Sequence, residues 1–432
     1  MKKIYQYILL AVAMVATASC SNELDDTLQP VNNGNLQFVV GDFPTFGEGT
    51  QTRVIGTQDE GKTAWENGDQ IIVTLISQKY GEQAAALTYN GSSWSTEASL
   101  SYLENETPSV SVFYAPCYEV TEEGTMQLRS GMQLGMTEYL FGNYEMENGI
   151  ITITFEGAIR DYSRLRIATM PEATLTVTTT DFTPAGATEV STAAYTLTTD
   201  NNGNAFLYGV FAEGATVSVK QGDVTLKDYT FTAEKNPGGT EHNKSYALDA
   251  TPVIDGTLGG KTEATEEEVN ALVQQLKEYV DNGITTIIVP GSQPATIDMG
   301  LWINTAIGEA IYRLSKEESY DGKIDLILPD VTEIVDQEFD GAHALNSINL
   351  PKVTTVGDGA FYDCQYLEEL TFGSVVTAIN HNTRAEFHRV GEKVEGCDLV
   401  LNREQVNAEA DYQPNIETST WWNTEWKSIT LK

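Results

Sequence analysis

The sequence predicts a mainly β protein with two tandem antiparallel β-sandwiches, followed by a short α/β leucine-rich repeat solenoid. Three observations predict this fold class. Between residues 35 and 251, short runs of alternating apolar and polar residues are separated by Gly, Asn and Asp, which is typical of antiparallel strands joined by tight turns. After residue 252 the apolar spacing becomes helical. From residue 328 onwards, two segments repeat at a fixed offset of 22, a period typical of leucine-rich repeats.

The composition limits the classes of partner. The chain has 432 residues, with 25 Lys and Arg against 62 Asp and Glu, for a formal net charge of −37. Binding of nucleic acid or anionic lipid needs concentrated basic residues, so neither is expected as a partner. The length allows about three domains of ~100–200 residues each.

The first twenty residues read as an export signal. Lys2 and Lys3 precede a short apolar run, and small residues lead into Cys20. The run is too short to span a bilayer. This end resembles the lipobox of bacterial lipoproteins, which implies that Cys20 is acylated and anchors the chain, since each buried methylene contributes ~0.8 kcal/mol. The alternative is an ordinary secretory signal with an incidental cysteine.

Residues 21–34 are polar and acidic without apolar periodicity, so they are expected to form a tether. An acidic segment behind an acylated cysteine resembles the surface-export signals of lipoproteins in the Bacteroidetes. That resemblance implies a lipid-anchored protein of the outer membrane that faces the outside of the cell.

Residues 35–162 carry the first predicted sandwich. In this segment, Trp65 is expected to plug the core, and the turn after it to deliver Ile71 and Val73 to the interior. The segment resembles the N-terminal domain of the fimbrillin family in four places: Thr52-Arg53, residues 62–71, Tyr89-Asn90 with Trp94, and residues 113–116. The resemblance implies that Arg53 is a site of proteolytic maturation by an arginine-specific protease. The alternative is an ordinary exposed arginine on a sheet edge.

Residues 163–251 carry the second predicted sandwich. Pairs such as Leu165 with Ile167 and Leu175 with Val177 alternate with polar residues, and the Thr-rich run from 174 to 180 suits a strand with one wet face. Residues 243–248 resemble the closing strand of the second fimbrillin domain. The segment Asp200–Asn204 fits a hairpin turn better than a calcium loop, because it lacks the terminal Glu.

Residues 252–432 are predicted to form the repeat domain with a helical N-terminal cap. Thr265 with Glu268 forms a capping box for a helix that ends at Asn282-Gly283. A buried strand at 284–289 and a second helix at 301–314 follow. Neither helix carries obvious chemistry.

The repeat is defined by three matched positions. Pro329, Phe339 and Leu345 recur as Pro351, Phe361 and Leu367, each at the same offset of 22. Such a period buries each turn against its neighbours. A third copy begins at Leu370, slips to an offset of 23 at Ile379 and loses the pattern by His381. Residues 359–367 closely resemble the BspA-like leucine-rich repeat family.

The repeat also predicts where contacts with partners lie. Strand side chains should form a continuous exposed face, for which we select Asp325, Asn349 and Thr371. Residues 398–401 and 421–431 are expected to cap the end of the stack. Within that cap, Trp421, Trp422 and Trp426 are interpreted as a lid over the core, with ligand contact as the alternative.

The sequence offers no constellation for catalysis or metal binding. It has no nucleophile elbow, zinc-protease motif or phosphate-binding loop, so we expect no enzyme activity and no cofactor. His381 and His388 are seven positions apart and are interpreted as surface residues. Cys117, Cys364 and Cys397 are expected to be buried thiols, with a Cys364–Cys397 disulfide as the alternative.

These features predict a surface adhesin or a fimbrial accessory subunit, at a tip or anchor position, that binds through its repeat domain. Expected partners are the outer membrane through the lipid anchor, other fimbrial subunits, and a host-matrix, bacterial-surface or glycan ligand. The alternative is a glycan-binding surface lipoprotein. Both functions rest on resemblance, because a fold alone does not define a function.

Overall fold

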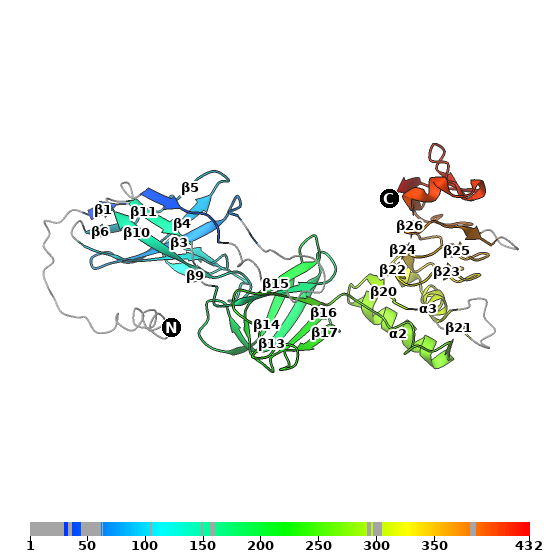
Figure 1. Ribbon diagram of the computed structural model, residues 1–432, viewed down its shortest axis with the longest axis horizontal. Coiled ribbons are helices and arrows are strands. Elements are labelled where there is room, and N and C mark those ends of the chain that lie inside the picture. Colours follow the sequence, from blue (N-terminus) through cyan, green and yellow to red (C-terminus); the bar gives the residue numbers. More distant parts are fainter. Residues whose placement is uncertain are drawn as a thin grey trace. The chain divides into compact units, whose positions relative to one another are not determined.

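The computed structural model describes residues 30–32, 37–44, 62, 64–103, 106–147, 150–155, 160–291, 295–296, 305–380 and 386–432. Cys20, Arg53 and His381 lie outside these residues. The described residues fall into two compact units. The first consists of residues up to 159 except 133–137, and the second of residues 133–137 and 160–432. The chain is mainly β, with two α-helices among its described residues (Figure 1).

The first unit is built on a seven-stranded sheet in the order β2-β11-β10-β7-β3-β4-β5. Its neighbouring strands are antiparallel, except that the edge strand β2 runs parallel to β11. The strands are β2 (Gln37–Val40), β3 (Gln70–Ser77), β4 (Gly81–Tyr89), β5 (Trp94–Ser95), β7 (Ser109–Tyr114), β10 (Leu140–Glu147) and β11 (Ile150–Thr154).

Trp65 is half-buried and packs against buried aromatic residues of this unit. Its indole N–H donates to the Gly41 carbonyl at 2.8 Å, and its ring contacts Trp94 and Tyr114 edge-on. Ile71 and Val73 are fully buried. Two small sheets complete the unit, pairing β1 (Pro30–Asn32) with β6 (Ser101–Leu103), and β8 (Tyr118–Val120) with β9 (Met126–Leu128). Strand β1 therefore lies within the segment that was predicted to be a tether.

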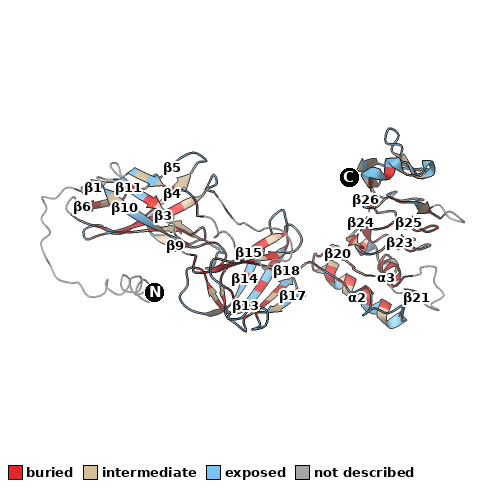
Figure 2. Cartoon of the chain, in the orientation of Figure 1, coloured by how far each residue is buried: buried red, intermediate tan, exposed pale blue. Residues whose placement is uncertain are grey.

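The second unit begins with another seven-stranded sheet, in the order β17-β16-β13-β15-β12-β18, with β14 paired to β13. Buried residues alternate mainly with exposed residues along β13 and with half-buried residues along β15 (Figure 2). The exposed Thr174, Thr176 and Thr178 alternate with buried residues, which confirms the predicted wet face. The strands are β12 (Ser163–Ala168), β13 (Thr174–Pro184), β14 (Ser191–Thr198), β15 (Asn204–Phe211), β16 (Thr216–Gln221), β17 (Val224–Thr230) and β18 (Ser245–Asp249).

The hairpin at Asp200 is held by that residue's own side chain. The Asp200 carboxylate accepts the backbone N–H groups of Asn202 and Asn204 at 2.8 and 2.9 Å. These bonds occupy it as a turn residue, as predicted.

Two helices precede the last sheets. Helix α2 (Glu266–Asp281) starts at the predicted capping box of Thr265 and Glu268. Helix α3 (Ala306–Leu314) is capped by Thr305, so its described part is shorter than the predicted 301–314. No described helix is long and apolar enough to cross a membrane.

Most of the remaining strands belong to two parallel sheets, which lie in the segment that we call the parallel-sheet region (residues 284–432). A six-stranded sheet follows the order β20-β22-β24-β26-β28-β31, and β23, β25 and β27 form a second sheet. The strands of the first are β20 (Thr286–Ile288), β22 (Ile324–Ile327), β24 (Leu345–Leu350), β26 (Glu369–Phe372), β28 (Asp398–Leu401) and β31 (Ser428–Leu431). Those of the second are β23 (Glu333–Ile334), β25 (Thr355–Val356) and β27 (Ala378–Ile379).

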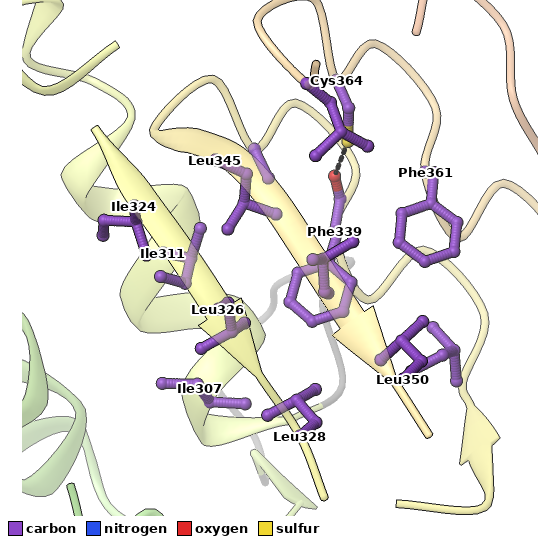
Figure 3. Packing of buried hydrophobic residues seen from close by; sticks show 14 of the residues in the cluster. Ile307, Ile311, Ile324, Leu326, Leu328, Phe339, Leu345, Leu350, Phe361 and Cys364 are labelled. Carbon is purple, nitrogen blue, oxygen red and sulfur yellow. Dashed lines mark hydrogen bonds between the residues drawn. The ribbon is translucent and has the colours of Figure 1, made fainter. Parts of the chain in front are cut away.

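Short elements lie before and between these strands. They are the pairs β19 (Glu263–Ala264) with β21 (Ala295–Thr296) and β29 (Thr420–Trp421) with β30 (Thr424–Glu425), and the 3₁₀ helices η2 (Glu318–Tyr320), η3 (Arg403–Asn407) and η4 (Ala410–Tyr412). Figure 3 shows how side chains from α3, β22 and β24 meet the rings of Phe339 and Phe361.

Candidate functional site

The candidate site is the outer face of the six-stranded parallel sheet. Leu326, Ile348 and Leu370 lie in register on neighbouring strands, at offsets of 22, and all are buried. Because side chains alternate across a strand, the residues on either side of these three point away from the core. The outer face is therefore a direct product of the repeat.

The outer face consists of two rows of residues that follow the strand pairing. The first row is Thr286, Asp325, Ser347, Glu369, Asp398 and Ser428. The second row is Ile288, Ile327, Asn349, Thr371, Val400 and Thr430. Neighbouring residues of a row are about 5 Å apart, the spacing of strands in a sheet.

The predicted contact residues fall in both rows. Asn349 and Thr371 are direct neighbours in the second row, whereas Asp325 lies in the first row beside Ser347. The counterpart of Asn349 on β22 is the apolar Ile327. All three predicted residues lie on one face, but Asp325 is displaced by two positions from the line of the other two.

Side-chain hydrogen bonds fix the acidic groups of the first row. Ser347 and Asn346 donate to the Asp325 carboxylate at 2.7 and 2.8 Å. Thr371 donates to Glu369 at 3.0 Å, and Ser428 donates to Asp398 at 2.6 Å. These bonds hold the carboxylates in place, so the face offers a defined pattern of acceptors.

Ser347, Glu369 and Asp398 were not among the contact residues predicted from the sequence. The repeat offset of 22, counted from Asp325, would have found Ser347 and Glu369. It could not have found Asp398, because the paired Leu370 and Leu399 are separated by an offset of 29.

The third repeat continues beyond His381, contrary to the prediction. Phe339, Phe361 and Phe387 form a ladder of stacked rings with centroids 5.7 and 5.8 Å apart. The offset from Phe361 to Phe387 is 26, so the chain is longer between these two positions than between the two preceding phenylalanines. The predicted slip to 23 at Ile379 is correct, since Val356 pairs with Ile379.

The end of the stack also differs from the prediction. Residues 398–401 and 428–431, expected as parts of a cap, form strands β28 and β31 that extend the parallel sheet. The segment between them holds η3, η4 and the β29–β30 pair. The sheet thus gains two strands whose spacing no longer follows the repeat.

The three C-terminal tryptophans have different environments. Trp421 and Trp426 are 1% and 4% exposed and pack beside Phe387, which makes them core residues. Trp422 is half-buried, stacks on Tyr412 with an interplanar angle of 7° and donates its indole N–H to Glu386 at 3.2 Å. Of the three, only Trp422 exposes part of its ring to solvent.

The three described cysteines are buried and form no disulfide. The Cys364 thiol donates to the Phe339 carbonyl at 3.0 Å (Figure 3), and burial raises the pKa of this thiol. The alternative of a Cys364–Cys397 disulfide is therefore wrong. The described residues contain no group of three or more His, Cys, Asp or Glu that could hold a metal ion.

Comparison with known proteins identifies one region of the chain. Residues 323–389 match the family model for a BspA type leucine-rich repeat region. No curated protein matches the sequence. Among solved structures, the chain is similar to a "putative cell adhesion protein" from Bacteroides fragilis NCTC 9343. The two share 13% identity with a TM-score of 0.27, over 50% of this chain and 92% of the other. A similarity at that score is too low to support a fold or function argument.

Proposed function

We propose that this protein is a surface-exposed, lipid-anchored adhesin or a fimbrial accessory subunit, and that it binds its partner through the outer face. The observation that carries the proposal is the pair of ordered rows, in a region that matches BspA type leucine-rich repeats. A side-chain array fixed on a rigid sheet binds without the cost of ordering a loop.

The proposal includes a finer architecture. In it, the two seven-stranded sheets belong to two fimbrillin-like β-sandwiches, at residues 35–162 and 163–251. Residues 252–432 form the short leucine-rich solenoid, with α2 and α3 as its N-terminal cap. Alternating burial along the antiparallel strands and the regular register of the parallel sheet support this division.

The proposal does not assign an enzyme activity or a cofactor. Candidate partners are host-matrix proteins, other bacterial surfaces, glycans and other fimbrial subunits. The outer membrane is the anchoring surface, and nucleic acid is not a proposed partner because of the net charge of −37.

The outer face can be tested with a matched pair of double variants of the full-length chain. N349R/T371R places two arginines at neighbouring positions of the second row. T176R/T196R does the same at two exposed, directly paired positions on β13 and β14. Both variants add the same charge and the same cross-strand repulsion, so they differ in which sheet is altered.

The measurement is binding to a panel of immobilised matrix proteins, whole bacterial cells and glycans. We expect N349R/T371R to weaken binding about tenfold or more, equivalent to about 1.4 kcal/mol. T176R/T196R should bind like the unmodified chain. Equal losses in both variants, or a loss confined to T176R/T196R, would place the contact elsewhere.

A glycan-binding surface lipoprotein is the second candidate, favoured by the half-buried Trp422. Its backbone φ of 48° lies in the left-handed region, which a bulky residue adopts at a cost. Aromatic rings of this kind can stack on sugars. In the same panel, this candidate requires saturable sugar binding that W422A abolishes and N349R/T371R leaves intact.

A further inference from the structure

The position before each phenylalanine of the stacked ladder carries an unexpected pattern. These residues are Glu338, Ala360 and Glu386, which precede Phe339, Phe361 and Phe387. All three are buried, with exposures of 1%, 0% and 2%. The middle repeat thus has a small apolar residue where both outer repeats have a buried glutamate.

Each of the two glutamates forms a hydrogen bond with a residue outside the stacked phenylalanine ladder. Glu338 accepts a hydrogen bond from the Thr305 hydroxyl at 3.0 Å, and Thr305 is the N-cap of α3. Glu386 accepts the indole N–H of Trp422, which is the residue after β29. The acidic side chains therefore join the two ends of the ladder to elements that are not repeats.

The contact of Glu338 with α3 is close. A Cβ atom at Gly308, in the first turn of this helix, would lie 2.4 Å from the Glu338 carbonyl oxygen. The hydroxyl of Thr305 also accepts the Gly308 N–H at 3.1 Å. The second carboxylate oxygen of Glu338 accepts the Val335 N–H at 3.0 Å. A change at this carboxyl group is thus transmitted directly to the start of α3.

Among the described residues around Glu338, no cation compensates a charge on its carboxyl group. The charged groups on the elements around it are Glu309 and Arg313 of α3, Glu333 and Asp336 of its own repeat, and Asp358 of the next. Arg313 is already engaged by Glu309 and Glu266. Burial raises the pKa of Glu338 to about 7 and the nearby Glu333 contributes to the rise, against the hydrogen bonds from the Val335 N–H and the Thr305 hydroxyl, which lower the pKa.

We infer that Glu338 is a proton-controlled latch that fastens helix α3 to the first repeat when its carboxyl is protonated and loosens it when the carboxyl ionises. The physical basis is that a buried carboxylate without a cation is costly, whereas the neutral acid is not. This device acts at one end of the stack and goes beyond the proposed adhesive function of the outer face.

The direction of the pH dependence follows from the raised pKa. In the open state, Glu338 would titrate near its ordinary value of 4.5. The latch is therefore fully closed below pH 4.5 and loses stability as the pH rises through about 7. Between pH 5.5 and 8.5, the opening equilibrium should increase roughly ten- to thirtyfold.

Hydrogen exchange on the full-length chain tests the latch, read by mass spectrometry on peptides that cover α3. Exchange rates at pH 5.5 and 8.5 are first corrected for the intrinsic pH dependence of amide exchange. We expect the protection of α3 in the unmodified chain to fall roughly ten- to thirtyfold over this range. E338Q should remove most of this dependence, because the amide cannot ionise.

E386Q is the matched control, since Glu386 occupies the equivalent position at the other end of the ladder. It should retain the pH dependence of α3. E338A, which copies the middle repeat, is a second variant should E338Q fail to fold. Protection of α3 that does not change with pH in the unmodified chain, or that changes equally in E338Q or E338A, would overturn the inference.

Discussion

At the scale of single residues, buried polar side chains mark the places where the repeat meets something else. Glu338 and Glu386 are two examples, and Gln405 of η3 is a third. The Gln405 side chain is fully buried, accepts the Val376 N–H at 2.8 Å and donates to the Val376 carbonyl at 3.0 Å. The Gln405 side chain thus forms hydrogen bonds with backbone groups that follow β26. Burying those groups without a partner would cost folding free energy.

The stacked phenylalanine ladder leads to a prediction at this scale. In F361A, the central ring is lost between two neighbours that lie 5.7 and 5.8 Å away. Because the site is fully enclosed, a cavity should remain, and the parallel-sheet region should lose about 3–5 kcal/mol. Native-state hydrogen exchange of β24 and β26 measures this loss.

F141A is the control for F361A, because Phe141 on β10 is 45% exposed and belongs to the first unit. It should leave exchange in β24 and β26 unchanged. A loss below about 1 kcal/mol in F361A would mean that the surrounding residues collapse into the space, so the ladder is less rigid than its packing indicates.

At the scale of elements, local patterns in the sequence were sufficient wherever the element is held by near neighbours. The capping box at Thr265 and the alternation in β13 follow from adjacent residues, and both were predicted. The pairing of β2 with β11 and of β18 with β12 joins distant segments in parallel. Nothing local distinguishes such edge strands, so their pairing could not be read from the sequence.

Within the candidate site, too, the sequence predicted only the features that follow the period of the repeat. That period predicted the strands from β22 to β26 and the position of Asn349 beside Thr371. The period does not predict the register shift between Ile324 and Asp325, where the offset to the next strand changes from 21 to 22. Strands β28 and β31 were missed as strands because Leu399 and Ile429 follow their partners on the preceding strand at offsets of 29 and 30, not 22.

Helix α3 allows a prediction in which two effects oppose each other. Replacing a helical glycine with alanine normally stabilises a helix by up to about 1 kcal/mol. At Gly308, however, the new Cβ would lie 2.4 Å from a backbone oxygen of Glu338. Backbone atoms cannot move aside cheaply, so G308A should instead destabilise the junction of α3 with the first repeat by about 1–3 kcal/mol.

Hydrogen exchange in α3, followed through thermal unfolding, measures this change in stability. Q274A, at an exposed position of α2, is the control and should change stability by less than about 0.5 kcal/mol. A stabilised G308A would show that α3 can move away from Glu338 without loss, which would also weaken the case for a latch at that contact.

At the scale of the whole molecule, the described residues divide into two units, and the second of them contains two separate hydrophobic clusters, one in the antiparallel sheet and one in the helices and parallel sheets. In the proposed function, the acylated Cys20 attaches the chain, and this residue lies outside the described part of the sequence. The placement of the outer face on a cell would then depend on chemistry at the N-terminus.

The last prediction concerns the N-terminus and distinguishes two forms of the mature protein, one anchored through an acylated Cys20 and one cleaved after Arg53. If Cys20 is acylated, two or three acyl chains at ~0.8 kcal/mol per buried methylene make the attachment nearly irreversible. Cys20→Ser should then move the protein from the membrane fraction to the soluble fraction and abolish incorporation of labelled palmitate.

Cleavage after Arg53 would instead remove the anchor together with the tether, so one molecule cannot be both cleaved and lipid-anchored. We expect mass spectrometry of the mature surface form to find an acylated Cys20 as its first residue. A mature form that begins at Val54 would contradict the anchored adhesin and favour assembly into a fimbria, in which a strand from another subunit completes the first sheet.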